Sequence, residues 1–281
     1  MKCSVIFIVY LGSVLCHEGS AMLLDAKCIP EKNFRGKIAN GVKTELESTP
    51  WMALIRNSSK GFICGGSLIH RNFVMTAAHC IENELYVNLG VYDQYCPPSI
   101  CKLVEEYSVT ENFTYNINGV QSDIGLLRLD RPVQYKEHIR PICIILGSRV
   151  NPLSIRKFSA YGWGKMENGK DSRFLRTITL YRRYAEECDP YLREMPYGMF
   201  CAGTENGDTC RGDSGGPLNA YVKHKQKWIY AQFGIVSYGT TSCNFNGYYI
   251  EVIRYKMWIM EVVTFRKHDY LWNVIKSPIK P

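Results

Sequence analysis

The sequence lacks the features that would place its main body in a membrane, a zinc-binding fold or a repeat array. After the first twenty residues, no stretch approaches the run of about eighteen apolar residues that a membrane-spanning helix requires. There is no C-x-x-C pair, no H-E-x-x-H motif and no further ligand at a suitable spacing from His79 and Cys80, which disfavours a zinc site. Internal repeats and low-complexity blocks are also absent. We therefore expect a soluble body without metal or cofactor.

What the sequence does contain indicates a globular, exported protein. Hydrophobic residues make up 46% and aromatic residues 12% of the 281 positions, enough to form a buried core rather than a disordered chain. Twelve cysteines are too few for a disulfide mini-scaffold but many for a reduced cytosolic enzyme. The net charge of +8 fits a solvated basic surface, with a binding site for a polyanion as the alternative.

The first twenty residues are typical of a secretory signal peptide. Lys2 precedes an uncharged run of twelve residues, 4–15, which is too short to span a bilayer. We expect cleavage between Cys16 and Ala21, although a buried N-terminal helix is the other interpretation. A signal peptide predicts a secreted, extracellular protein. Its removal leaves ten of the twelve cysteines, an even number that suggests full pairing.

The remaining chain shows the pattern of a β protein. Short apolar runs rich in Val, Ile, Phe and Tyr are separated by Gly, Pro, Asn and Ser, which favours a sandwich or a barrel. The clearest runs are 51–55, 66–69, 73–78, 124–129, 142–146 and 229–238. One helical pattern lies near the end, at about 255–263, where apolar residues recur at steps of three and four.

Three short segments carry the chemistry. His79 follows an apolar run, Asp123 opens another, and Ser214 lies among glycines in the segment 212–217, at spacings of 44 and 91 residues. A serine hydroxyl needs a base during attack, a neutral imidazole is the usual base, and a carboxylate fixes the imidazole tautomer. A single histidine is more often a packed or surface residue, but the three segments in this order point to nucleophilic catalysis.

Together these segments resemble the trypsin-like serine proteases of the chymotrypsin family, and among them secreted insect proteases without a clip module. The resemblance covers residues 38–263 and implies an all-β fold of two six-stranded antiparallel Greek-key barrels with a C-terminal helix. It also implies that His79 is the general base and then acid, that Asp123 orients it, and that Ser214 is the acylated nucleophile. The backbone N–H groups of Gly212 and Ser214 would form the oxyanion hole.

The resemblance further implies cleavage after Arg or Lys. Asp208 stands six residues before the nucleophile and corresponds to the floor of the primary specificity pocket, where a carboxylate favours a long cationic side chain. Ser237, Tyr238, Gly239 and Gly247 correspond to the pocket walls, and their glycines leave room for a large side chain. The alternative is that Asp208 is a solvated surface acid.

Activation by proteolysis is implied by the residues at the start of the matched region. The pair Lys37-Ile38 resembles the family's activation site, where cleavage frees an ammonium at Ile38 that pairs with a buried acid, here Asp213. The expected division is a signal peptide (1–20), a propeptide or light chain (21–37) and a peptidase domain (38–281) with a tail beyond about 263. Because Lys37 is basic, the activator would itself be trypsin-like.

By resemblance, the ten remaining cysteines form five disulfides. Cys28 with Cys143 would tether the light chain after activation. The other expected pairs are Cys64–Cys80, Cys188–Cys201, Cys210–Cys243 and, in a small surface loop, Cys96–Cys101. A further family disulfide is missing at both of its positions, which Phe158 and Ala220 occupy, so its loss leaves no thiol unpaired.

Two further features concern glycosylation and calcium. Asn57 and Asn112 begin N-glycosylation sequons. Val91 stands where vertebrate trypsins have a calcium-binding glutamate, so we expect no calcium site. Nearby acids that could compensate are Asp93, Glu105 and Glu106.

The leading hypothesis is a secreted zymogen of a serine endopeptidase in an extracellular cascade, such as insect haemolymph immunity. Its partners would be protein or peptide substrates with Arg or Lys at the cleavage site, an activating protease and serpin-type inhibitors, with no nucleic acid and no membrane. A catalytically silent homologue acting as a binding adaptor and a digestive trypsin are the alternatives. The adaptor is disfavoured because no triad residue is replaced.

Overall fold

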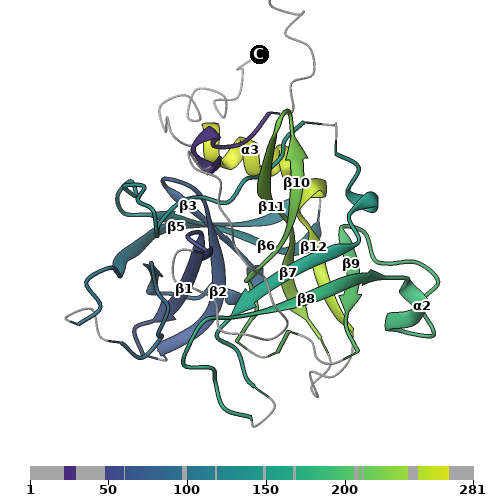
Figure 1. Ribbon diagram of the computed structural model, residues 1–281, viewed down its shortest axis with the longest axis horizontal. Coiled ribbons are helices and arrows are strands. Elements are labelled where there is room, and N and C mark those ends of the chain that lie inside the picture. The colour runs from purple at the N-terminus through teal and green to yellow at the C-terminus, as the bar shows by residue number, and fades with distance from the viewer. Residues whose placement is uncertain are drawn as a thin grey trace, which may run out of the picture.

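The computed structural model shows two barrels of antiparallel strands packed side by side (Figure 1). It describes residues 22–29, 48–59, 61–96, 100–117, 119–147, 150–166, 169–205, 209–210, 212–239 and 246–265. Each barrel closes with six strands, so the expected fold is confirmed.

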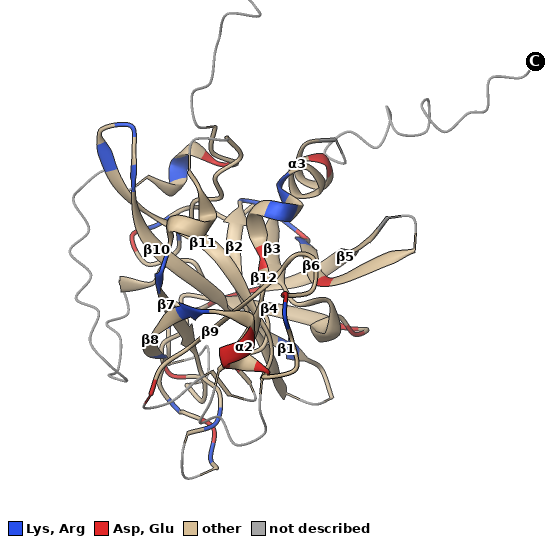
Figure 2. Ribbon diagram, turned by 90° about the vertical axis from the view of Figure 1, so that its right-hand side faces the viewer, with Lys and Arg blue, Asp and Glu red and all other residues tan. Residues whose placement is uncertain are grey.

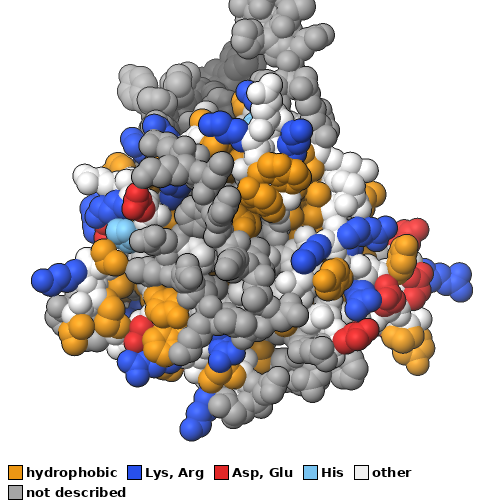
Figure 3. Space-filling view, in the orientation of Figure 1, with side chains coloured by type: hydrophobic (Ala, Val, Ile, Leu, Met, Phe, Trp, Pro, Cys, Tyr) orange, Lys and Arg blue, Asp and Glu red, His pale blue; other side chains and the backbone are white. Residues whose placement is uncertain are grey.

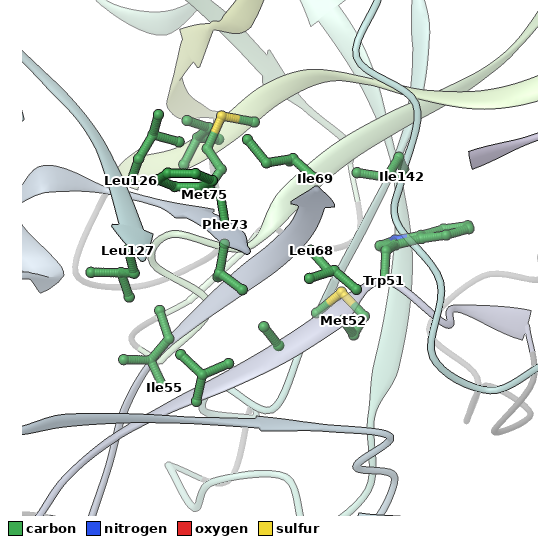
Figure 4. Packing of buried hydrophobic residues seen from close by; sticks show 14 of the residues in the cluster. Trp51, Met52, Ile55, Leu68, Ile69, Phe73, Met75, Leu126, Leu127 and Ile142 are labelled. Carbon is green, nitrogen blue, oxygen red and sulfur yellow. The ribbon is translucent and has the colours of Figure 1, made fainter. Parts of the chain in front are cut away.

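The first barrel is built from the N-terminal half of the chain, in the order β1-β2-β3-β6-β5-β4. Its strands are β1 (Met52–Asn57), β2 (Gly61–His70), β3 (Phe73–Thr76), β4 (Leu85–Leu89), β5 (Glu105–Ile117) and β6 (Val120–Leu129). Figure 4 shows side chains from several of these strands, including Ile55, Leu68 and Met75, gathered in one apolar interior. Strands such as β3 are buried on both faces, which explains why the sequence shows continuous apolar runs instead of alternation.

The second barrel repeats this arrangement in the C-terminal half, in the order β10-β11-β12-β9-β8-β7. Its strands are β7 (Lys157–Gly162), β8 (Arg176–Arg183), β9 (Met199–Gly203), β10 (Pro217–His224), β11 (Lys227–Tyr238) and β12 (Gly247–Glu251). A hydrogen bond from Ser67 Oγ to Gln232 Oε1, 2.7 Å long, joins β2 to β11 and so links the two barrels.

Helical segments are short. They are η1 (Ala26–Cys28), η3 (Ala78–Cys80), η4 (Pro152–Ser154), α2 (Ala185–Cys188), η5 (Val252–Tyr255) and α3 (Lys256–Phe265). The last of these confirms the helical pattern near the end of the sequence, and it buries Ile259, Val262 and Val263 against the first barrel's core. Within the described residues, no helix has the length and apolar character needed to cross a membrane.

The apolar run 142–146 forms no strand, in contrast to the other apolar runs. It is the buried connection between the barrels, and its pairing with other segments is limited to isolated bridges, from Cys143 to Ala231 and from Ile145 to Leu23. The Leu24 N–H also donates to the Ile144 carbonyl at 3.0 Å. The apolar character of this run therefore reflects its burial beneath the segment 22–29 and not a place in a sheet.

Phe158 and Ala220 lie on the neighbouring strands β7 and β10, one residue beyond the pair Asn219↔Ser159. Phe158 is 1% exposed and its ring packs 5.1 Å from that of Phe200. Ala220 is buried in the same core. A large and a small apolar residue thus fill the space that the family's disulfide would occupy.

We expect Phe158→Ala to lower the free energy of unfolding by about 3–5 kcal/mol, since it leaves a cavity in the second core. Urea unfolding followed by tryptophan fluorescence measures this change. Tyr191→Ala is the matched control because Tyr191 is 94% exposed, and its effect should stay within about 0.5 kcal/mol. Equal effects of the two substitutions would contradict the packing role of Phe158.

Candidate active site

His79 is held against Asp123 by its backbone and by its ring. It lies in the short helix η3, directly after β3, where the disulfide Cys64–Cys80 fixes the next residue to β2. Its Nδ1 lies 2.9 Å from Asp123 Oδ2 and 3.0 Å from Oδ1, and its backbone N–H donates to Oδ1 at 2.9 Å. An ionised carboxylate selects the tautomer with a proton on Nδ1, which leaves Nε2 as the free base.

Asp123 receives donors from both barrels. Ser237, near the end of β11, donates its hydroxyl to Asp123 Oδ2 at 2.5 Å. Burial by itself would raise the pKa of Asp123, but the hydrogen bonds from His79 and Ser237 hold that pKa below its ordinary value. The acid therefore stays charged at neutral pH. The sequence predicts Ser237 only as a residue of the substrate-pocket wall, and its contact with the acid is visible only in the structure.

Ser214 lies in a turn whose glycines have positive φ, +97° at Gly212 and +77° at Gly215. A Cβ on Gly215 would lie 2.1 Å from Thr76 Oγ1 and 3.0 Å from the Ala77 nitrogen, so only glycine fits this contact with the chain that leads into His79. The Ser214 carbonyl accepts from the Gly65 N–H at 2.8 Å. These contacts bind the serine turn to the first barrel, on the side that carries the histidine.

Asp213 occupies a niche walled by glycines. Its carboxylate accepts from the Gly164 N–H at 2.8 Å and from the Cys210 N–H at 2.9 Å. A Cβ on Gly162 or Gly164 would lie within 2.0 or 2.6 Å of that carboxylate. Burial raises the pKa of Asp213 to about 6, against the lowering effect of the two N–H donors. Within the described part of the chain, no cationic side chain pairs with it.

The structure describes one side of the predicted substrate pocket. Gly247 begins β12 and Gly239 follows β11. Their neighbours Tyr248 and Tyr238 pair across these two strands, and the two rings stack with centroids 4.8 Å apart. Tyr238 is 54% exposed. Three further predicted site residues lie outside the described residues, namely Lys37, Ile38 and Asp208.

Tyr255 contacts the residue before Asp123, and the sequence does not predict this contact. Its hydroxyl lies 2.7 Å from the hydroxyl of Ser122, the residue before Asp123, and its side chain is buried. A Cβ on Gly198 would fall 1.9 Å from the same hydroxyl, so a glycine is needed there. In the sequence Tyr255 is only one apolar residue of the helical pattern, and no local motif identifies its partner 133 residues away.

Comparison with known proteins decides the family. The Trypsin family profile matches residues 38–259. The chain belongs to the trypsin family. As a member, it is a serine-type endopeptidase.

Several curated proteins are similar to this trypsin-family chain. Serine protease grass of Drosophila melanogaster is 32% identical over 257 residues, which cover 81% of this chain and 68% of that protein. Phenoloxidase-activating factor 3 of Holotrichia diomphalia is 32% identical over 295 residues, covering 90% of this chain and 83% of that protein. Melanization protease 1 of Drosophila melanogaster is 34% identical over 264 residues, with shares of 81% and 66%.

Disulfides of this trypsin-family protease frame the site. The structure contains the pairs Cys28–Cys143, Cys64–Cys80, Cys96–Cys101 and Cys188–Cys201. Cys210 is also disulfide-bonded, and its expected partner Cys243 lies outside the described residues. The possible metal-binding atoms of Cys64, His79 and Cys80 lie within 4.8 Å of one another, but the two sulfurs are bonded to each other and offer no thiolate to a metal.

The acids that could bind calcium in this protease already have partners. Asp93 forms an ion pair with Arg173 at 2.9 Å, and Val91 is buried. Glu105 pairs with Lys136, and this ammonium together with the Tyr107 hydroxyl keeps the pKa of Glu105 low despite its burial. The remaining acid, Glu106, accepts from the Asn88 amide. Arg173 and Lys136 thus already neutralise Asp93 and Glu105, while the partner of Glu106 is a neutral amide.

We expect Ser237→Ala to lower kcat/KM by about tenfold, because a hydrogen bond to a charged group contributes about 1.5–3 kcal/mol and part of that is recovered by water. Steady-state hydrolysis of a peptide substrate measures it. Ser154→Ala is the matched control, since Ser154 is an exposed serine whose hydroxyl also makes one hydrogen bond, to Asn151. An unchanged kcat/KM in Ser237→Ala would show that the second barrel does not support the acid.

Proposed function

We propose that His79, Asp123 and Ser214 form the catalytic triad. The bidentate contact between His79 Nδ1 and the Asp123 carboxylate carries this proposal, because it leaves Nε2 as a base. Ser214 Oγ attacks the substrate carbonyl while Nε2 takes its proton, and Asp123 stabilises the resulting imidazolium. The backbone N–H groups of Gly212 and Ser214 stabilise the oxyanion. His79 then protonates the leaving amine, and water hydrolyses the acyl-enzyme by the reverse sequence.

Specificity for Arg or Lys is the second part of the proposal. It rests on Asp208, six residues before Ser214, whose carboxylate would bind a guanidinium or ammonium at the pocket floor. The neighbouring Thr209 hydroxyl lies 3.0 Å from that of Tyr249, a fully buried residue of β12. This contact supports a pocket floor that is held firmly by the second barrel.

Activation by cleavage after Lys37 is the third part. The new ammonium of Ile38 would enter the niche around Asp213, where two N–H groups already bind the carboxylate and its pKa is raised by burial. An ammonium there would compensate a charge that is costly to bury alone. The pairing orders the neighbouring oxyanion turn, so cleavage would switch activity on.

After that cleavage the light chain, 21–37, would stay attached to the peptidase domain, 38–281, which includes a tail beyond about 263. The signal peptide, 1–20, would already have been removed. Cys28–Cys143 provides the covalent link. Asp25 accepts from the Tyr135 hydroxyl, and the backbone of Leu24 donates to Ile144. The retained segment is thus held by covalent and noncovalent contacts.

An extracellular proteolytic cascade is the proposed setting. Relatives include two phenoloxidase-activating factors and a melanization protease, whose names refer to phenoloxidase activation and to melanization. The disulfides suit an oxidising compartment. The partners would be protein substrates, an activating protease and serpin-type inhibitors.

A glycan is proposed at Asn112 in preference to Asn57. Asn112 is exposed on β5, and Thr114 shares its face. Asn57 is 9% exposed, its Nδ2 donates to the Asn83 carbonyl at 2.8 Å, and its Oδ1 accepts from Ser59. A glycan on that nitrogen would have to displace packed chain.

The test of the function uses a serine-directed phosphonate and a panel of peptides. After cleavage at Lys37 the chain should be labelled at Ser214 and should cleave after Arg and Lys at least a hundredfold faster than after Phe or Leu. Ser214→Ala should take no label, and Lys37→Gln should stay unlabelled after treatment with the activator. Labelling of Lys37→Gln would refute the zymogen. No label in any form would support an adaptor, and faster cleavage after Phe or Leu would exclude Asp208 as the pocket floor.

Asp213 also predicts a pH dependence that changes on activation. The folded-state pKa of Asp213 is about 6, above the unfolded value of about 3.9. Between these pH values the native state therefore binds more protons than the unfolded state. As a result, this group makes the uncleaved chain less stable as the pH rises from about 4 to 6. Pairing with the Ile38 ammonium would lower the pKa and abolish that loss. Urea midpoints of cleaved and uncleaved Ser214→Ala at pH 4.5 and 7 test this, with Asp213→Asn identifying the contribution of this acid. The same pH dependence in both forms would contradict the pairing.

A further inference from the structure

The hairpin formed by β10 and β11 carries an exposed aromatic face that the catalytic chemistry does not use. Tyr221 on β10 lies opposite Tyr230 on β11, and Lys223 lies opposite Trp228. Residues two apart on a strand share a face, so these four side chains lie on the same side of the hairpin. Tyr221 and Trp228 are 49% and 54% exposed, while Val222 and Ile229 on the other side are buried.

These aromatic rings are held in a fixed arrangement. The Tyr221 and Trp228 rings stack with centroids 5.3 Å apart and planes 19° apart, and Tyr230 packs 4.8 Å from Tyr221. Tyr230 in turn lies 5.5 Å from Trp51, a buried residue of the first barrel's core. The exposed rings of Tyr221 and Trp228 therefore rest on buried rings. A ligand that stacks on them would lose little binding free energy to the ordering of side chains.

Lysine side chains give the end of this hairpin a positive charge. Lys223, Lys225 and Lys227 are all exposed at the tip, and within the described residues none of them pairs with a carboxylate. The sequence contains no Asp or Glu between Asp213 and Glu251. Figure 2 shows the hairpin tip blue with no red beside it, and in Figure 3 hydrophobic side chains gather over β10 and β11 with basic side chains around them.

In the turn at the tip, Lys225 adopts a left-handed backbone conformation that is unfavourable for a lysine. Lys225 has φ +55°, in the left-handed region that Asn and Gly occupy most easily in two-residue hairpin turns. Such a conformation costs a residue with a long side chain about 1 kcal/mol. A local cost of this kind is often found where a side chain serves binding.

We propose that this face, formed by Tyr221, Lys223 and Trp228, binds an anionic polysaccharide that carries sulfate or carboxylate groups, together with the tip lysines Lys225 and Lys227. The C–H faces of a pyranose ring stack on aromatic rings, and its anionic groups bind the lysine ammoniums. An anionic membrane fits less well because the turn itself, Lys225-Gln226-Lys227, carries only charged and polar side chains, so the tip has no apolar side chain to insert ahead of the aromatic pair. An acidic peptide could bind the lysines, but it would not require the stacked rings of Tyr221 and Trp228.

Binding at this face would leave the proposed active site open. Ser237, which contacts Asp123, lies ten residues along β11 from Lys227, or about 33 Å at the usual rise of a strand. The polysaccharide would thus hold the protease on a surface while substrates reach the triad. This inference goes beyond the proposed proteolytic function and does not depend on it.

The test measures binding of the full Ser214→Ala chain to heparin, with neutral dextran as the uncharged comparison. We expect heparin to bind and dextran not to bind. The triple variant Lys223→Gln, Lys225→Gln, Lys227→Gln should bind heparin roughly tenfold to a hundredfold more weakly, since each exposed charge contact contributes about twofold to fivefold. The matched control Lys102→Gln, Lys157→Gln, Lys170→Gln removes the same charge from exposed lysines elsewhere and should change affinity by less than about threefold.

The aromatic part is tested by Trp228→Ala, which should weaken binding about fivefold to tenfold, and by Trp228→Phe, which should restore most of it. Urea midpoints of these variants separate loss of the ring from loss of folding. The proposal is overturned if both triple variants weaken binding equally, if Trp228→Ala binds as well as the parent, or if phosphatidylserine vesicles or polyglutamate bind more tightly than heparin. Because the chain carries Ser214→Ala, these results are independent of the protease assays.

Discussion

The carboxylate of Asp123 is the point on which the two barrels converge. The first barrel supplies the acid from β6 and the histidine from the segment after β3, and the second barrel supplies the Ser237 hydroxyl from β11. These donors together hold the pKa of Asp123 below its ordinary value, although burial alone would raise it. Each barrel must therefore close, and the two must meet in one register, before the site exists.

Asp213 is the second critical carboxylate, and its pKa is shifted in the opposite direction to that of Asp123. Asp123 has a lowered pKa because the hydrogen bonds from His79 and Ser237 outweigh its burial, whereas within the described residues Asp213 has two backbone N–H donors and a raised pKa. Asp123 is thus compensated in the folded chain, whereas within the described residues no cationic side chain pairs with Asp213, and the proposed activation by an Ile38 ammonium rests on this difference.

A row of aromatic rings relates the interior to the surface. Tyr161, Trp51, Tyr230, Tyr221 and Trp228 contact one another in that order, with centroid distances from 4.8 to 6.2 Å. The buried end of this row lies between the barrels, and the exposed end forms part of the hairpin face. The same packing that holds the barrels together thus also fixes the geometry of a surface far from the triad.

The sequence predicted the family, the two barrels and the cysteine pairs through resemblance, and it predicted His79, Asp123 and Ser214 as site residues because each lies in a short local motif. Tertiary packing was needed to show that the run 142–146 is a buried connection, that Ser237 binds the acid, that Tyr255 reaches Ser122 and that the Asn57 amide is occupied. Hydrophobicity reports that a residue is buried but not which partner buries it, and hydrogen bonds between residues more than a hundred positions apart, as for Ser237 and Tyr255, leave no trace in local spacing. Those partners are set by how the two barrels pack.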